Sequence, residues 1–388
     1  MTPVPRYLLA AVLAALVLNA VLLYRAQGTG YVRQRPLARS GARLAHFVTK
    51  KPNAAIYALV RNRELGSLLE TMQDMERNFN AHPDTQYPYV FLNDEPFTER
   101  FMRHVRAATH ARVYFGQVPP EEWAVPASVD MDRARKSWEL MQRQHVAYAD
   151  SQSYRQMCRY QSGLFMNHPL MQPFDYYWRI EPGVSYFCEM LDPDPFRVMR
   201  DRQKKYGWVI TLRDDPRTLP TLWEQTQAFR AQYPQYALNT SMMPFFQTRR
   251  KQYNTCHFWT SAWMPDPDFE IADLRWMRSE AYQAFFRYLD ATNGFFYERW
   301  GDAPVHSLAV GLFLNESEVH YFEDIGYQHP PFRHCPVAQP GRCACVPEDS
   351  LGTEYSGSGQ NCLYLWNKLH GELGVDAFER LRVAALET

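Results

Sequence analysis

Residues 54–94 read AAIYALVRNRELGSLLETMQDMERNFNAHPDTQYPYVFLND, and this stretch already indicates the fold class. The run AAIYALVRN is apolar up to its polar end, which is typical of a strand buried on both faces of a sheet. Leu and Met then recur at helical spacing over residues 64–80, and YPYVFLND is a second apolar run that ends at Asp94. Strand, helix and strand in this order form a βαβ unit, so the sequence predicts an α/β fold.

The rest of the chain continues this alternation. Further strands are expected at 111–118, 176–181 and 206–216, and a strand followed by a loop at 319–331. Helical spacing is found at 133–145, 153–165, 219–232 and 279–291. Because we find no internal repeat and no low-complexity tract, we predict one α/β domain with a central mixed β-sheet flanked by helices.

The composition bounds the function class. The chain has 388 residues, of which 46% are apolar and 15% aromatic, so it can bury a substantial core. Lys+Arg and Asp+Glu both number 42, and this balance gives no sign of a nucleic-acid groove or a polybasic membrane binder. The aromatic content fits either an aromatic core or a surface that stacks on the flat faces of sugars.

The N-terminus predicts a membrane anchor. Residues 7–23, YLLAAVLAALVLNAVLL, are apolar except for Asn19, and this length is close to the minimum that crosses a bilayer. The alternative is a cleaved signal peptide, but its apolar core would be shorter and YRAQG matches the A-x-A cleavage pattern poorly. We therefore expect a short tail (1–6), a transmembrane helix (7–24), an Arg-rich stem (25–51) and a catalytic domain (52–388).

Two signals disagree about the orientation of this anchor. The arginines are concentrated after the span, and the positive-inside rule would then place the C-terminal side in the cytosol. The glycosylation sequons at 239–241 and 315–317 have meaning only in a lumenal or secreted chain.

The seven cysteines predict disulfides. In a lumenal domain, the cluster in HCPVAQPGRCACVPED (334–349) would staple a loop that has little apolar pattern of its own. The competing interpretation is a zinc site made by His334, Cys335, Cys343 and Cys345, but the C-x7-C-x-C spacing lacks the usual paired C-x2-C knuckles. We favour disulfides, with one cysteine left free because the number is odd.

Charged residues follow several predicted strands, at the place where α/β sheets bind ligands. Arg61, Asp94 and Glu181 lie at or just past the carboxyl ends of these strands, and Glu181 precedes a Pro-Gly turn. Each also has a structural explanation, since Arg61 could pair with Asp94 or Glu64 and Asp94 could simply end its strand. Their joint occurrence at one kind of position favours a binding site.

A further carboxylate stands in apolar surroundings. Glu270 is flanked by Phe269 and Ile271, which is where perturbed, working carboxylates are often found. The neighbouring acids have structural explanations: Asp273 would cap the following helix, and the two at 266 and 268 would lie on a solvated Pro-rich loop.

Five segments now carry a resemblance to a known family. They are YPYVFLNDEPF (87–97), YYWRIEPGVSYFCEM (176–190), CHFW with FEIADL (256–259 and 269–274), NGFFYERWGDAPVHS (293–307) and FEDIGYQHPPF (322–332). They resemble, in order, the signature blocks of the fungal Golgi α-1,2-mannosyltransferase family, glycosyltransferase family 15. The chain departs from the family pattern at Asn293, where the family has glycine, and in AWMPDPD (262–268), which is longer than the family spacing.

The resemblance implies a single-pass type II protein of the Golgi membrane whose lumenal domain has a GT-A-like α/β fold. The implied activity is the transfer of mannose from GDP-mannose to the 2-hydroxyl of a mannose acceptor, on a glycoprotein or oligosaccharide, with retention of the α configuration and dependence on Mn²⁺. Glu181 resembles the metal-contacting carboxylate of the family and His329 its second metal ligand. Mn²⁺ accepts both ligand types.

The remaining roles follow from the same resemblance. Arg61 would help to hold the nucleotide, and Asp94 lies at the same edge of the sheet. Tyr154 and Asp302 would lie near the donor and acceptor sugars. Glu270 resembles the candidate nucleophile. We interpret His306, one turn past Asp302, as a helix-packing residue instead of a third metal ligand.

Retention allows two mechanisms, either a covalent mannosyl-Glu270 intermediate or attack on the face from which the diphosphate departs. In both, Glu270 would lie near the anomeric carbon. Two other classes stay open at this point: a glycoside hydrolase that pairs Glu270 with a second carboxylate, and a mannose-binding protein without catalysis.

Overall fold

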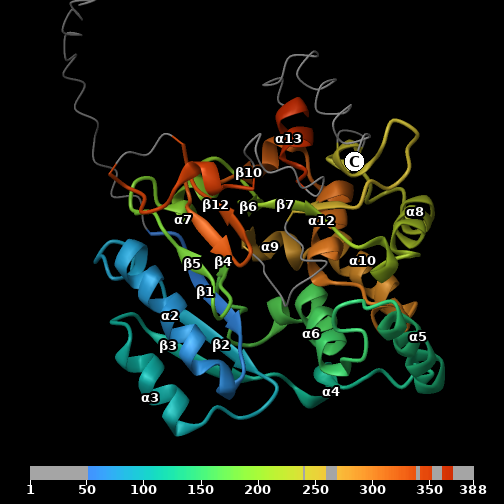
Figure 1. The fold of residues 1–388 in the computed structure, drawn as a ribbon, viewed down its shortest axis with the longest axis horizontal. Helices are drawn as coiled ribbons and strands as arrows, with labels where there is room; N and C mark the ends of the chain where they lie inside the picture. The colour runs from blue at the N-terminus through green and yellow to red at the C-terminus, as the bar shows by residue number, and fades with distance from the viewer. Residues whose placement is uncertain (1–50, 239–240, 259–268, 338–340, 352–360, 370–388) are drawn as a thin grey trace, which may run out of the picture. The chain divides into compact units, whose positions relative to one another are not determined.

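The computed structural model describes residues 51–238, 241–258, 269–337, 341–351 and 361–369 (Figure 1). The predicted tail, the anchor and nearly all of the stem lie outside the described residues, so the membrane topology stays a prediction. Among the described residues, no helix has both the length and the apolar character needed to cross a bilayer.

A seven-stranded mixed sheet forms the centre of the domain, in the order β10-β6-β9-β4-β1-β2-β3. The strands β3, β2, β1 and β4 are parallel, whereas β9 runs antiparallel to both of its neighbours. The strands are β1 (Ala54–Leu59), β2 (Tyr89–Asn93), β3 (Val113–Gln117), β4 (Tyr176–Arg179), β6 (Tyr206–Trp208), β9 (Glu270–Asp273) and β10 (Val319–Tyr321). The predicted central mixed sheet is confirmed.

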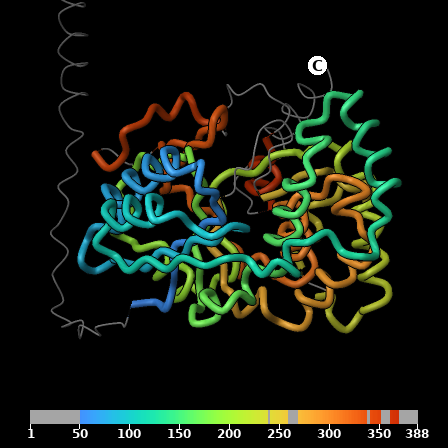
Figure 2. The backbone as a smooth tube through the Cα atoms, turned by 90° about the horizontal axis from the view of Figure 1, so that it is seen from below, coloured from blue at the N-terminus to red at the C-terminus, as the bar shows by residue number. Residues whose placement is uncertain are grey.

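Helices cover both faces of this sheet. The helices of the described residues are α2 (Leu65–Met75), α3 (Glu99–Ala107), α4 (Pro120–Trp123), α5 (Met131–Arg143), α6 (Gln152–Gly163), α7 (Pro195–Asp201), α8 (Leu222–Gln232), α9 (Leu274–Met277), α10 (Glu280–Ala291), α11 (Gly294–Tyr297), α12 (Asp302–Phe313) and α13 (Leu363–Leu369). In Figure 2, the first βαβ unit, in blue and cyan, and the helices of residues 280–313, in orange, lie on opposite sides of the domain.

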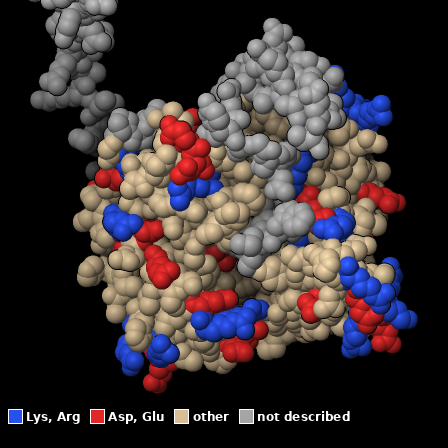
Figure 3. Space-filling model, viewed as in Figure 1, with Lys and Arg blue, Asp and Glu red and all other residues tan. Residues whose placement is uncertain are grey.

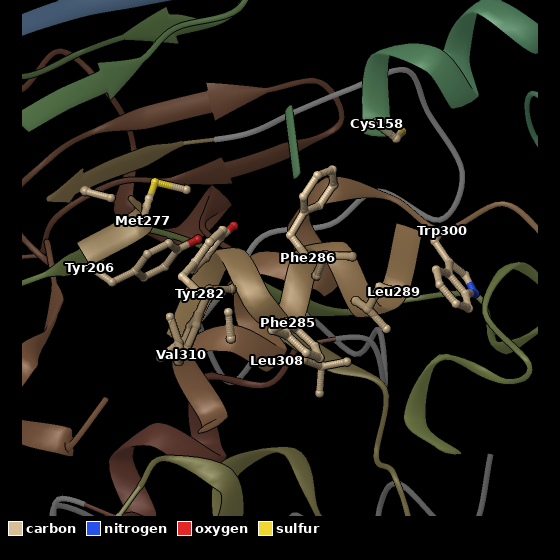
Figure 4. Packing of buried hydrophobic residues seen from close by; sticks show 14 of the residues in the cluster. Cys158, Tyr206, Met277, Tyr282, Phe285, Phe286, Leu289, Trp300, Leu308 and Val310 are labelled. Carbon is tan, nitrogen blue, oxygen red and sulfur yellow. The ribbon is translucent and has the colours of Figure 1, made fainter. Parts of the chain in front are cut away.

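Successive side chains of β1 point to opposite faces of the sheet, and this explains why both faces are covered. Ile56 and Ala58 belong to a buried cluster with residues of α2, α3 and α7. Ala55 and Tyr57 belong to a second cluster with residues of α6, α10 and α12. Figure 4 shows part of this second cluster, in which Phe285 of α10 lies beside Leu308 of α12. A strand with apolar residues at every position needs such a double cover.

The prediction of one strand over 206–216 is wrong. The chain forms β6 in the central sheet and then β7 (Thr211–Arg213), which pairs with β8 (Cys256–Phe258) in a separate two-stranded sheet. Val209 and Ile210, between the two strands, are also buried. The apolar pattern therefore runs across the break, and no local signal marks the change of partner.

The prediction of a loop after β10 is also wrong in part. This segment contains β11 (Tyr327–His329), which pairs antiparallel with β12 (Phe332–His334) and with β5 (Ser185–Tyr186) in a three-stranded sheet. Because β5 follows the turn after β4, this small sheet joins two distant parts of the sequence.

Three disulfides connect the described cysteines: Cys188–Cys343, Cys256–Cys362 and Cys335–Cys345. Cys158 is buried and takes part in none of these disulfides. The prediction of disulfides with one cysteine left over is confirmed. The zinc alternative is excluded because all three of its cysteines are oxidised, and His334 Nε2 instead contacts the Glu323 carbonyl at 2.8 Å.

Removing the Cys256–Cys362 disulfide should destabilise the domain. This bond ties β8 to the start of α13 across a sequence separation of 106. We expect the double variant Cys256→Ala/Cys362→Ala to lose about 2–5 kcal/mol of unfolding free energy, measured by urea denaturation. The Cys335–Cys345 pair, with a separation of 10, is the matched control and should lose about 2 kcal/mol less if the loop-closure account holds. Equal losses would contradict that account.

His320 on β10 should make stability fall in acid. Burial, followed by the positive charges of Lys204 and Arg202, lowers the pKa of His320 from 6.5 to about 4. Between these values the unfolded chain binds the proton more readily than the folded one, so the free energy of unfolding decreases as pH falls from 6.5 towards 4. Between pH 7 and pH 4.5, we expect the free energy of unfolding to fall by about 1–3 kcal/mol less in His320→Gln than in the wild type. Parallel urea midpoints in the two proteins would refute this assignment.

On the face seen in Figure 3, basic and acidic side chains occur in small mixed groups, in keeping with the equal numbers of each sign in the sequence.

Candidate active site

A pocket of about 350 Å³ gathers most of the predicted site residues. Its lining includes Arg61, Asp94, Tyr154, Glu181 and His329. Arg61, Asp94 and Glu181 follow β1, β2 and β4, whose carboxyl ends meet at one edge because the three strands are parallel. Tyr154 comes from the first turn of α6 and His329 from β11. Segments that are far apart in the sequence therefore meet at the edge where α/β sheets bind ligands.

The turn after β4 fixes Glu181. Gly183 has a φ of +89°, a conformation that glycine adopts without strain. The Thr71 hydroxyl on α2 contacts the carbonyl oxygens of Glu181 at 3.0 Å and Val184 at 2.9 Å, and it accepts a hydrogen bond from the Gly183 N–H at 3.0 Å. The Pro-Gly turn is thus tied to a helix, and the Glu181 side chain is held at the pocket.

The three-stranded sheet places His329 opposite this turn. Gln328 and Tyr327 on β11 pair with Ser185 and Tyr186 on β5, so His329 extends the pairing towards Glu181. The Nδ1 atom of His329 lies 3.1 Å from the Pro330 carbonyl. Since a carbonyl only accepts, Nδ1 carries the proton and the lone pair is on Nε2. Burial lowers the pKa of His329 to about 4, so the imidazole is neutral at physiological pH.

These two residues have the chemistry of a metal site. Glu181 offers a carboxylate, and the neutral His329 offers a ring nitrogen whose partner nitrogen is fixed by a carbonyl, the usual arrangement of a ligating histidine. Within the described part of the chain, no group of three or more His, Cys, Asp or Glu is arranged to hold a metal. A metal held by Glu181 and His329 would therefore need further ligands from a substrate and from water.

Arg179 is a central residue that the sequence did not single out. It is 2% exposed, and its Nε donates to Glu181 Oε1 at 2.6 Å. Its Nη1 donates to Asp302 Oδ2, so one guanidinium links two buried carboxylates. The signal that could have found it is the spacing in WRIE: residues two apart on a strand share a face, so Arg179 lies on the side of Glu181.

The structure does not bring Asp302 and Glu270 to the pocket wall. Asp302, in the first turn of α12, is bound to Arg179, and its place near the sugars stays a prediction. Glu270 is 3% exposed and lies directly opposite Arg179 in the antiparallel pairing of β4 and β9. Asp302 is therefore connected to the pocket through Arg179, which lines it, and Glu270 is the backbone partner of Arg179 on the neighbouring strand. The AWMPDPD segment before Glu270 lies outside the described residues.

His306 is buried and its ring lies near that of Tyr282, in keeping with a packing residue, but it also has two polar partners that the sequence did not predict. Its Nδ1 lies 2.7 Å from Glu270 Oε2, and its Nε2 lies 3.0 Å from the Gln161 carbonyl. The sequence pattern missed this contact because every residue of α12 is buried, so the helix has no polar face that would mark the histidine.

An aromatic wall and an amide complete the pocket. Tyr154 stacks on Tyr148 with ring centroids 4.5 Å apart, and the Tyr154 hydroxyl accepts from Arg299 at 2.9 Å. Asn93 is 1% exposed, and neither atom of its amide has a hydrogen-bond partner among the described residues. A buried amide without partners is costly, so a ligand in this pocket is the natural partner of Asn93.

Known proteins resemble this chain over most of its length. The family model described as glycolipid 2-α-mannosyltransferase matches residues 32–371. The O-glycoside α-1,2-mannosyltransferase homolog 2 of Schizosaccharomyces pombe is 45% identical over 76% of this chain and 77% of its own length. The α-1,2 mannosyltransferase KTR1 of Saccharomyces cerevisiae is 41% identical over 85% of this chain and 82% of its own.

Solved structures agree with these matches. The core-mannan synthase A (CmsA/Ktr4) of Aspergillus fumigatus, determined in its Mn/GDP form, has a TM-score of 0.76 and 42% identity and covers 82% of this chain and 85% of its own. The mannosyltransferase Ktr4p of S. cerevisiae in complex with GDP has a TM-score of 0.76 and 37% identity, with 82% of each chain covered. The chain therefore belongs to the glycolipid 2-α-mannosyltransferase family, glycosyltransferase family 15.

Proposed function

We propose that this protein is a retaining, Mn²⁺-dependent α-1,2-mannosyltransferase that transfers mannose from GDP-mannose to the 2-hydroxyl of a mannose acceptor. The observation that carries the proposal is the single pocket in which Glu181 and His329 meet Arg61, Asp94 and Tyr154. A site for a nucleotide sugar needs a metal-binding pair, cationic groups for the diphosphate and flat surfaces for rings, and this pocket has all three.

The charge of the pocket and the solved structures of relatives support GDP-mannose as the donor. Arg61 and Arg63 line the pocket, where Arg61 is half-buried and Arg63 is exposed. Two such cations are suited to the two phosphates of a GDP-linked sugar. The structures of CmsA and Ktr4p contain GDP, which supports a guanine nucleotide donor here.

Glu181 and His329 would hold Mn²⁺, with the diphosphate and water completing the coordination shell. When bound, the metal would neutralise the negative charge that develops on the departing diphosphate. The Mn/GDP form of CmsA supports this choice of metal. Arg179 keeps the Glu181 carboxylate oriented through a bond of 2.6 Å, so the ligand is positioned before the metal arrives.

The protein groups around the sugar have separate tasks. The stacked Tyr148 and Tyr154 offer flat faces to sugar or base rings. Glu270, opposite Arg179, would stabilise positive charge at the anomeric carbon, by bonding to it or by its field, which are the two routes to retention. In either route the bond from the anomeric carbon to the diphosphate oxygen breaks and the electron pair leaves with GDP. The anomeric carbon bonds to the acceptor oxygen, directly or after a mannosyl-Glu270 ester, and the acceptor's hydroxyl proton passes to the released diphosphate.

We also propose that the domain is lumenal and that the protein is a single-pass type II protein of the Golgi membrane, anchored by residues 7–24. The disulfides support this location, because such bonds persist in oxidising compartments.

The test is acceptor-dependent release of GDP. Purified protein is incubated with GDP-mannose and Mn²⁺, with and without an α-mannoside, and the product linkage is read by NMR. We expect GDP to be released quickly only with the acceptor and the product to be α-1,2-linked. Equal release without acceptor would indicate a hydrolase, and binding without release would indicate a mannose-binding protein.

A further inference from the structure

Two residues on one side of α12 bind two neighbouring residues of the central sheet. Asp302 and His306 are four residues apart and so lie on one side of the helix. Asp302 binds Arg179 on β4, and His306 binds Glu270 on β9. Arg179 and Glu270 are direct partners in the pairing of these strands. One turn of helix therefore positions Arg179, which lines the pocket, and Glu270, its partner in the strand pairing.

The hydrogen bonds of His306 determine where its protons lie. The Gln161 carbonyl, 3.0 Å from Nε2, can only accept, so Nε2 carries a proton. The remaining proton lies between Nδ1 and Glu270 Oε2, which are 2.7 Å apart. Either an imidazolium donates to an ionised Glu270, or a protonated Glu270 donates to a neutral imidazole.

The surrounding charges favour the imidazolium. The groups that face His306 are Glu270 from β9, Asp302 from its own helix, Arg179 from β4, the Gln161 carbonyl from α6 and the Tyr282 ring from α10. Burial opposes a charge on the ring, but the Glu270 charge and hydrogen bond and the Asp302 charge outweigh it, so the pKa of His306 is raised.

The two carboxylate oxygens of Glu270 differ in their hydrogen bonding. Oε2 is bound to His306, whereas Oε1 is buried and has no hydrogen-bond partner among the described residues. An unpartnered buried carboxylate oxygen is costly, and such groups are found where a substrate supplies the missing interaction.

We propose that His306 is a positioning residue for Glu270: as an imidazolium it holds Oε2, fixes the plane of the carboxylate and leaves Oε1 as the oxygen that meets the anomeric carbon. This role rests on the proposed function, and it applies equally to a covalent and a same-face mechanism. The substrate does not touch His306, which acts only through Glu270.

Two substitutions separate this role from packing. In His306→Asn, the side-chain amide takes the place of Nδ1 and still donates to Glu270. In His306→Gln, the amide takes the place of Nε2, so it keeps the bond to the Gln161 carbonyl and loses the one to Glu270. We expect His306→Gln to lower kcat by about 10-fold to 100-fold with the KM for GDP-mannose changed less than about 3-fold, and His306→Asn to recover most of the loss. Equal kcat in both variants would overturn the proposal.

If the glutamine variant does not fold, the protonation of His306 can still be tested by NMR on the wild-type protein. In ¹⁵N-histidine NMR at pH 7.5, we expect one histidine to carry protons on both ring nitrogens, and this signal to become neutral in Glu270→Gln. The absence of such a histidine would refute the imidazolium. Because this spectrum requires no substrate, it distinguishes failure of the present inference from failure of the proposed donor or acceptor, which would show as no transfer by the wild type.

Discussion

The variant Glu270→Gln should lose transfer while it keeps GDP. Glutamine has nearly the same shape and can still bond to His306, but it has no negative charge to stabilise or bond to the anomeric carbon. Removing one such electrostatic group commonly costs about 10²–10³ in kcat, so we expect less than a tenth of wild-type turnover. Because Glu270 is proposed to act on the mannosyl carbon and GDP carries no mannose, GDP affinity in the presence of Mn²⁺ should change less than about 3-fold.

The matched control is Glu280→Gln. Glu280 is an exposed residue of α10 that pairs with Arg287, and its loss should leave turnover unchanged, since surface ion pairs are worth little. Turnover is measured from GDP release with acceptor present and GDP affinity by calorimetry. A Glu270→Gln enzyme with more than a tenth of normal turnover would exclude the proposed role.

Removal of Mn²⁺ should stop the reaction almost completely. Without the metal, the diphosphate would lose the dication that bridges it to the protein, and the negative charge that develops on the leaving group would be stabilised only by arginine side chains. After treatment with a chelator we expect activity of a few per cent or less, together with weaker binding of GDP. Adding Mn²⁺ back should restore both, which shows that the protein was not denatured.

Variants of the proposed ligands should locate the metal. His329→Ala should raise the Mn²⁺ concentration needed for half-maximal GDP binding by at least about 10-fold. His320→Gln, which alters an imidazole on β10 outside the pocket lining, should leave that concentration unchanged. Full activity in the chelated enzyme, or equal Mn²⁺ requirements in the two variants, would refute the metal assignment.

Local patterns predicted the first part of the fold well. The βαβ unit at residues 54–93 could be read because an apolar run, a helical period and a second apolar run are each encoded within a short segment. The same patterns failed at 206–216 and after β10. In both places the strand bonds to a distant partner, and partner choice leaves no local period in the sequence.

The chemistry available to this protein can be predicted from its amino-acid sequence: a carboxylate before a Pro-Gly turn, a histidine in IGYQHPP, an acid between apolar neighbours and cysteines suited to disulfides. These features depend on residue type and on neighbours along the chain. The pairing of the charges, in contrast, could be found only from the folded chain. Arg179 meets Asp302 across a sequence separation of 123, and His306 meets Glu270 across 36. Such contacts arise from strand register and from one helix turn packed on the sheet, and buried charges must find their partners there because water is excluded.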